Sequence, residues 1–159
     1  MAEQRTEDQS LLQNAAERYL RDSYDFNGRR DRIAESIYSD PGQWQAFAEM
    51  GWLALPIPEE FGGLGLGTRE MAILAELCGR FLVTEPLIDA LASTTAILNR
   101  GQQRETLLPQ VAEGTLVPIA AIDEAHGGSR LTPTTTLTQT NSGWQLKGSK
   151  HWISAGASA

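Results

Sequence analysis

Apolar residues recur at helical spacing through most of the chain. In Glu7–Ser23 they form one stripe, which predicts an amphipathic helix. The residues of that stripe are Leu11, Leu12, Ala15, Ala16, Tyr19 and Leu20. Asp25–Ser39 keeps weaker helical spacing after a break at Asn27-Gly28. Pro41 directly follows Asp40 and marks the start of another helix, because proline is well tolerated at the first helical position.

Three more helical runs are predicted in the middle of the chain. Thr68 is a suitable N-cap for the strongest of them, in which Gly79 would let a neighbouring element approach closely. The segment Thr84-Glu85-Pro86 is expected to cap the second run, which would end at Gly101. The third run, Gln102–Glu113, is expected to be split into two short turns by Pro109.

The segment Trp52–Gly67 contains too many prolines and glycines to be helical. We expect an ordered loop that Phe61 and Leu64 fix to the core. Glu59 and Glu60 suggest a catalytic acid, but no partner base lies near them in the sequence. We therefore interpret both as structural, and we expect no catalytic group in this loop.

The hydrophobic period changes after Gly114. Leu116–Ile122 is a continuous apolar run that predicts a buried strand. The threonine-rich stretch Leu131–Thr140 is prone to form a strand, and Asn141-Ser142-Gly143 is typical of a hairpin turn. A further strand is predicted at Trp144–Lys147. After a turn at Gly148-Ser149, a returning strand would carry Trp152 and Ile153.

These patterns predict an α+β fold of two parts. Residues 1–114 would form an all-α helical domain, and residues 115–159 the beginning of a small antiparallel β sheet or barrel of three or four strands.

Composition and charge limit the range of possible partners and functions. The chain has 159 residues and a net charge of -7, which argues against nucleic acid or an anionic membrane surface as a partner. No stretch is long and apolar enough to predict a membrane span or a signal peptide, so we expect a cytoplasmic protein. Cys78 is the sole cysteine and is expected to be a buried, unreactive thiol. No metal site is expected.

Two segments near the end of the chain are expected to face the same flat ligand. One is the polar turn Asp123–Arg130, which follows the predicted strand Leu116–Ile122. The other is the triplet Trp152-Ile153-Ser154, which combines an aromatic ring, an aliphatic side chain and a hydroxyl.

The same segments resemble a known family. The turn Asp123–Arg130 is similar to the T-E-P-x-A-G-S-D motif of the acyl-CoA dehydrogenases, and residues 148–156 are similar to their G-x-K-x-W-I-T-N-G motif. Upstream, Gly51-Trp52 followed by residues 58–65, P-E-E-F-G-G-L-G, resembles a third family element. Three motifs in the right order are far more specific than one glycine pattern. The resemblance covers most of the chain.

The resemblance implies an FAD-dependent enzyme that removes the α-proton and the β-hydride of an acyl-CoA thioester, with the hydride going to flavin N5. It implies flavin contacts at Ile122, Asp123, Gly128, Ser129, Trp152, Ile153 and Ser154, with Ser129 also touching substrate. The family's catalytic carboxylate belongs to a third, helical domain that we expect to lie outside this chain, so no catalytic residue is assigned here. We expect the chain by itself to lack flavin and activity.

The resemblance also implies an electron-transfer flavoprotein as acceptor and a homo- or hetero-oligomer. Asp123 stands where the family usually has threonine, Ala125 replaces a proline and Arg130 an aspartate. These departures leave two alternatives open. The protein could be a non-catalytic subunit of a heteromeric acyl-CoA dehydrogenase, or a flavin-dependent monooxygenase on the same fold.

Overall fold

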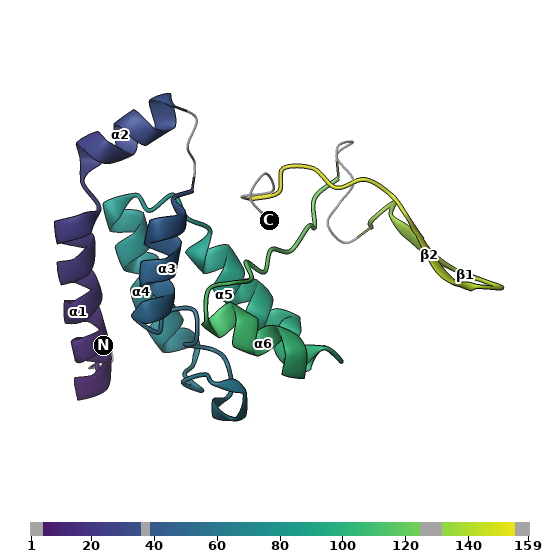
Figure 1. The fold of residues 1–159 in the computed structure, drawn as a ribbon, viewed down its shortest axis with the longest axis horizontal. Coiled ribbons are helices and arrows are strands. Elements are labelled where there is room, and N and C mark those ends of the chain that lie inside the picture. Colours follow the sequence, from purple (N-terminus) through teal and green to yellow (C-terminus); the bar gives the residue numbers. More distant parts are fainter. Residues whose placement is uncertain (1–4, 36–38, 125–131, 155–159) are drawn as a thin grey trace.

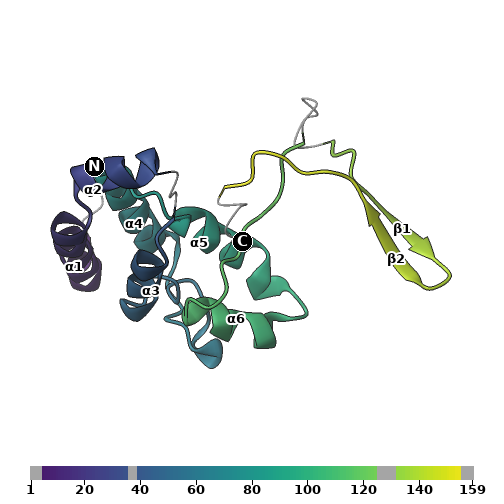
Figure 2. The same cartoon turned by 45° about the horizontal axis from the view of Figure 1, so that its top comes forward.

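The computed structural model describes residues 5–35, 39–124 and 132–154. Six α-helices form one body within these ranges, and a two-stranded antiparallel hairpin stands apart from it at the end of two extended arms (Figures 1 and 2). The helices are α1 (Glu7–Ser23), α2 (Phe26–Ala34), α3 (Pro41–Glu49), α4 (Thr68–Phe81), α5 (Leu87–Ala96) and α6 (Arg104–Ala112). The strands are β1 (Thr136–Thr140) and β2 (Gly143–Lys147). The predicted fold class is confirmed.

Side chains near the starts of α1, α3 and α4 satisfy free backbone N–H groups, whereas α5 has no side-chain cap bond and ends at Ala96. The cap expected from Thr84-Glu85-Pro86 and the end expected at Gly101 are therefore wrong. Thr6 and Gln9 form a capping box at α1, in which each side chain accepts a hydrogen bond from the other residue's backbone. Asp40 caps α3 by accepting from the N–H of Gly42 at 2.8 Å. At α4 the cap is Gly67, whose N–H donates to Glu70 at 3.0 Å. Thr68, expected as the cap, is the first helical residue.

The main core is built around an aromatic cluster. Phe47 of α3 stacks on Trp52 with ring centroids 4.8 Å apart, and Tyr19 of α1 meets both rings edge-on. Leu20 of α1 and Leu74 of α4 are fully buried beside them. Burial of each such side chain contributes about 1.5–3 kcal/mol. Trp44 also lies in this core, as expected, and its indole N–H donates to the carbonyl of Gly114 at 3.1 Å.

A second, smaller core lies under α6. It consists of Ile57, Leu108 and Val111, with Phe61 packed against them. The expectation that Pro109 splits this segment is wrong, because α6 is one continuous helix through Pro109. Proline removes a single i→i−4 hydrogen bond there. The buried neighbours Leu108 and Val111 hold the helix against Ile57.

The loop from Trp52 to Gly67 is ordered and contains only one short 3₁₀ turn, η1 (Glu59–Phe61). Three backbone bonds close it, from Leu64 to Ala54, from Gly65 to Ile57 and from Leu66 to Leu55. Leu64 itself is 48% exposed, so it does not fix the loop as expected; Leu53, Leu55 and Ile57 do. Glu59 and Glu60 are exposed, and the lack of a catalytic role there stays a prediction.

The β part differs from the prediction in two places. Leu116–Ile122 is not a strand, and the segment with Trp152 and Ile153 is not a strand either. The single described hairpin pairs Thr136 with Lys147 and Thr140 with Gly143. A strand needs a neighbour for its backbone bonds, and within residues 132–154 only β1 and β2 provide one for each other. The described β strands are thus two, not three or four; the boundary near Gly114 stays a prediction.

Cys78 is buried in α4, as expected. Burial raises the pKa of its thiol to about 12, so the thiolate form is suppressed and the residue is unreactive. Gly79 next to it is exposed, and nothing lies within 4 Å of the position that a Cβ would take. The predicted close approach of a neighbour at Gly79 is therefore wrong. None of the described helices combines the length and apolar character that crossing a bilayer requires.

Two glycines with opposite surroundings test this packing. A Cβ on Gly63 would lie 1.9 Å from the carbonyl oxygen of Ile57, so Gly63→Ala should destabilise the chain by roughly 1–3 kcal/mol. Gly79→Ala should stabilise it by up to about 1 kcal/mol, because alanine favours a helix interior. Urea unfolding followed by circular dichroism measures both. Equal midpoints for the two variants would contradict this packing.

Candidate functional site

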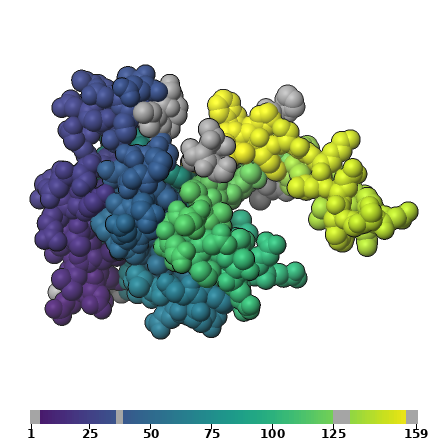
Figure 3. Space-filling model, in the orientation of Figure 1, coloured from purple at the N-terminus to yellow at the C-terminus, as the bar shows by residue number. Residues whose placement is uncertain are grey.

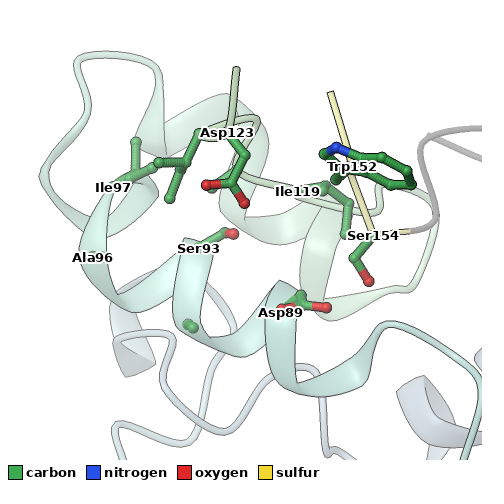
Figure 4. A pocket seen from close by; sticks show the side chains of 11 residues that line it. Asp89, Ser93, Ala96, Ile97, Ile119, Asp123, Trp152 and Ser154 are labelled. Atoms are coloured by element: carbon green, nitrogen blue, oxygen red, sulfur yellow. The ribbon is translucent and has the colours of Figure 1, made fainter. Parts of the chain in front are cut away.

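A hollow of about 370 Å³ lies between α5 and the two segments that the sequence singled out (Figure 4). One side is formed by Asp89, Ala92, Ser93 and Ala96 of α5, followed by Ile97. The other side is formed by Ile119, Ala120, Ile122 and Asp123. Trp152 and Ser154 complete it. The structure thus brings four of the predicted site residues, Ile122, Asp123, Trp152 and Ser154, to one cavity.

The predicted ligand wall, Trp152, is almost fully in solvent. Its side chain is 90% exposed, and its backbone has a φ of 55°, in the left-handed region that side chains rarely adopt. Ile153 is half-buried and does not line the cavity, whereas Ser154 is exposed and does. Gly128 and Ser129, like Ala125, His126 and Arg130, lie outside the described residues. The binding roles of all these residues stay predictions.

Backbone and side-chain bonds join the two segments. The N–H of His151 donates to the carbonyl of Asp123 at 2.8 Å. The ammonium of Lys150 donates to the carbonyl of Ile122 at 3.1 Å and pairs with the carboxylate of Glu124 at 2.8 Å. Residues 122–124 and 150–151 are therefore held side by side, which places Asp123 and Trp152 at the same cavity.

Glu124 is the centre of this junction, which we call the Glu124 clasp: Glu124, Thr134, Thr135 and Lys150. Its side chain is only 10% exposed. It accepts the backbone N–H groups of Thr134 and Thr135 at 2.8 and 3.0 Å, and both threonine hydroxyls. Lys150, then the threonine donors, hold the pKa of this carboxyl well below its usual range.

Sequence reasoning gave the Glu124 clasp no role. A usable signal was present, because Lys147 and Lys150 are the only lysines of the chain and Lys150 lies two residues before Trp152. The α5 wall was also missed. Asp89, Ser93 and Ile97 recur at a spacing of four, which places them on one face of the helix opposite the leucine face.

A buried carboxylate fixes the start of α5. Glu85 is 5% exposed, accepts the N–H of Asp40 at 3.1 Å and accepts the hydroxyl of Tyr24. The N–H of Thr84 donates to the same Tyr24 oxygen at 2.9 Å. Burial, then the bond to Glu85, raises the pKa of Tyr24. These bonds tie α1 and α3 to the residues before α5, and so position its Asp89 and Ser93.

Comparison with known proteins identifies the family. A family model described as "Acyl-CoA dehydrogenase, N-terminal domain" matches residues 6–115. The chain belongs to the acyl-CoA dehydrogenase family. It is 32% identical over 118 residues to (2S)-methylsuccinyl-CoA dehydrogenase of Cereibacter sphaeroides, a match that covers 71% of the chain and 22% of that protein.

Solved structures of similar proteins agree with the fold. A variant of the steroid ACAD Tcur3481-Tcur3483 has a TM-score of 0.81 and 31% identity, over 92% of this chain and 41% of that one. An acyl-CoA dehydrogenase complexed with FAD from Bacillus anthracis has a TM-score of 0.76. At 21% identity, over 96% of this chain and 28% of that one, it supports the fold alone. The chain thus spans less than half the length of these acyl-CoA dehydrogenases.

Among the described residues, no group of three or more histidine, cysteine, aspartate or glutamate side chains is arranged to hold a metal ion. The polar groups of the cavity are carboxylates and hydroxyls from Asp89, Ser93, Asp123 and Ser154. This donor and acceptor set suits hydrogen bonding to an organic ligand.

Titration of Glu124 tests the clasp. The pKa of Glu124 in the folded chain lies below the ordinary value of 4.5. The ionised Glu124 therefore contributes its full stabilisation of the fold above pH 4.5, and this contribution is lost as the pH falls through the lower pKa of the folded chain. Carbon-13 NMR of the Glu124 carboxyl should therefore show a midpoint well below 4.5. Lys150→Met should move the midpoint upward, and Lys147→Met, which changes the exposed lysine of β2, should leave it in place. A midpoint near 4.5 in the unchanged chain would show that the clasp does not form.

Proposed function

We propose that the chain forms the N-terminal part of an FAD-dependent acyl-CoA dehydrogenase, which oxidises an acyl-CoA thioester to its 2-enoyl form. One observation carries this proposal: the two motif segments meet α5 at a single cavity, with Trp152 and Ser154 on one side and Asp123 on the other. The family membership supports it. We further propose an electron-transfer flavoprotein as electron acceptor and an oligomeric assembly.

The groups around the cavity suit a flavin ring. The exposed indole of Trp152 offers a flat apolar surface for stacking, and the Ser154 hydroxyl can donate a hydrogen bond. The Ile122 carbonyl accepts from Lys150 and keeps a second lone pair. With the family's roles carried over, Ile153, Gly128 and Ser129 would add contacts to the ring and phosphates. When bound, FAD supplies the acceptor for the substrate's β-hydride.

The chain's own part in this reaction is to bind and orient. Trp152 would fix the plane of the flavin, and the Glu124 clasp would keep Asp123 and Trp152 at a constant separation, which matters because misplaced reactants lose much of their rate. The base that removes the α-proton is proposed to come from a part of the protein beyond these residues. No described residue is assigned that step.

The half-buried Asp123 favours a second candidate, a non-catalytic subunit of a heteromeric enzyme. An ionised carboxylate accepts hydrogen bonds but cannot donate one. It also repels a negatively charged ligand, and so would disfavour an anionic reduced flavin in this cavity. Threonine, which the family usually has at this position, can donate a hydrogen bond and carries no charge.

The colour of the intact protein separates the two candidates. A dehydrogenase should be yellow as isolated and should bleach under anaerobic conditions when an acyl-CoA substrate is added. Trp152→Ala should weaken FAD binding by about tenfold through the loss of stacking. Trp144→Ala, which removes an exposed indole from β2, should not. A colourless protein that takes up no added FAD would favour the non-catalytic subunit.

The chain by itself should be isolated without flavin and without activity. Trp152 is 90% exposed, so stacking there buries only one face of a ligand. Each open hydrogen bond is worth about 1 kcal/mol or less where water competes. We also expect self-association through exposed apolar residues such as Leu137, Trp144 and Leu146. Flavin absorbance in a desalted sample, together with monomeric sedimentation, would contradict this prediction.

A further inference from the structure

The α5 side of the cavity carries two polar side chains, Asp89 and Ser93, among the apolar Ala92, Ala96 and Ile97. Ser93 lines the cavity and is only 7% exposed, and among the described residues its hydroxyl has no hydrogen-bond partner. In Figure 4 the Ser93 hydroxyl points into the cavity, toward the side on which Asp123 lies. The residue is buried as a whole, but its hydroxyl oxygen is not among the buried side-chain atoms without a partner, so it is accessible to a ligand in the cavity. This group is therefore suited to a ligand atom.

Asp89 lies one helical turn before Ser93 and also lines the cavity. Residues four apart on a helix share one face, with Cβ atoms about 6 Å apart. A single oxygen atom between them can reach both side chains with hydrogen bonds of about 2.8 Å. Ala92 and Ala96, which also line the cavity, are small and leave room for a ligand beside α5.

We propose that the acyl group accepted by this site carries a hydroxyl beyond its β-carbon, held between Ser93 and Asp89. This inference rests on the proposed function and specifies its substrate class. The hydroxyl oxygen accepts a hydrogen bond from Ser93, and its proton is donated to the carboxylate of Asp89. The two α5 side chains determine substrate specificity and take no part in the chemical step.

Other acyl groups satisfy this pair less well. Asp89 is exposed and keeps its contact with water, but a plain alkyl chain would cover the Ser93 hydroxyl without giving it a partner. A site that hydrogen-bonds a substrate group discriminates against a ligand that lacks the group. A keto oxygen accepts from Ser93 but has no proton to donate to Asp89. The expected order of preference is therefore hydroxyl, then keto, then unsubstituted alkyl.

The test uses the intact flavin-containing protein and matched thioesters. Octanoyl-CoA and dodecanoyl-CoA are compared with their hydroxy and oxo counterparts, substituted at each carbon beyond the β-carbon, and kcat/KM is measured by flavin bleaching. At least one hydroxyacyl thioester should exceed its unsubstituted counterpart roughly tenfold or more. Ser93→Ala should reduce that ratio by roughly fivefold to tenfold, the effect of one lost hydrogen bond.

Two more variants separate recognition from general damage. Asp89→Asn gains an N–H donor, so it should raise the preference for the oxo thioester relative to the hydroxy one. Thr95→Ala removes a hydroxyl of the same helix that bonds the Leu91 carbonyl and Met71 instead of lining the cavity. It should leave every ratio unchanged.

The outcomes distinguish this inference from the function on which it rests. If unsubstituted thioesters bleach the flavin as well as every hydroxylated one, or if Ser93→Ala leaves the ratio unchanged, the hydroxyl inference is wrong and the dehydrogenase stands. If no thioester bleaches the flavin, the proposed function fails. Calorimetric binding of the same thioesters then decides the inference: tighter binding of a hydroxyacyl-CoA, lost in Ser93→Ala, supports it, and equal binding overturns it.

Discussion

The cavity depends on one carboxylate whose hydrogen bonds hold its two chain segments together. Glu124 is bonded by Lys150, by two backbone N–H groups and by two threonine hydroxyls. A shielded ion pair stabilises a structure only when its remaining lone pairs are also satisfied, and here they are. Lys150 extends the junction to the Ile122 carbonyl. Asp123 and Trp152 flank these residues, so they share one cavity although neither segment is a strand.

The α5 side of the cavity depends on a second carboxylate, Glu85. Its bonds to Tyr24 and to the backbone of Asp40 connect the start of α5 to the helical body. Burying a charged group without partners would cost several kcal/mol, so these bonds specify one position for the chain before α5. The two walls of the cavity are therefore set by two separate polar junctions. Hydrophobic burial supplies most of the stability of the helical body, while these junctions determine where Ser93 and Asp123 lie.

The hairpin is held differently from the helices. In the space-filling view of Figure 3 it forms the lobe farthest from α1. Leu137 pairs with Leu146 and both are exposed, as is Trp144. A hairpin with no packed face keeps its backbone bonds but gains little from burial. Its contribution to the site is indirect: β1 follows Thr134 and Thr135, which bond Glu124, and β2 leads back toward Lys150.

The sequence by itself determined most of the helices and the hairpin at residues 136–147, because capping residues, turn residues and hydrophobic period act over a few neighbours along the chain. Its three motifs indicated the family by resemblance. It also named Asp123, Trp152 and Ser154, because their motifs are local. Tertiary structure decided the rest. Pro109 stays within α6 because Leu108 and Val111 are buried against Ile57, and Leu116–Ile122 is no strand because a strand requires a partner. Glu124 bonds Thr134, Thr135 and Lys150, which lie 10 to 26 positions along the chain, and the cavity that Ser93 lines is completed by residues 26 to 61 positions away. No local pattern specifies these contacts.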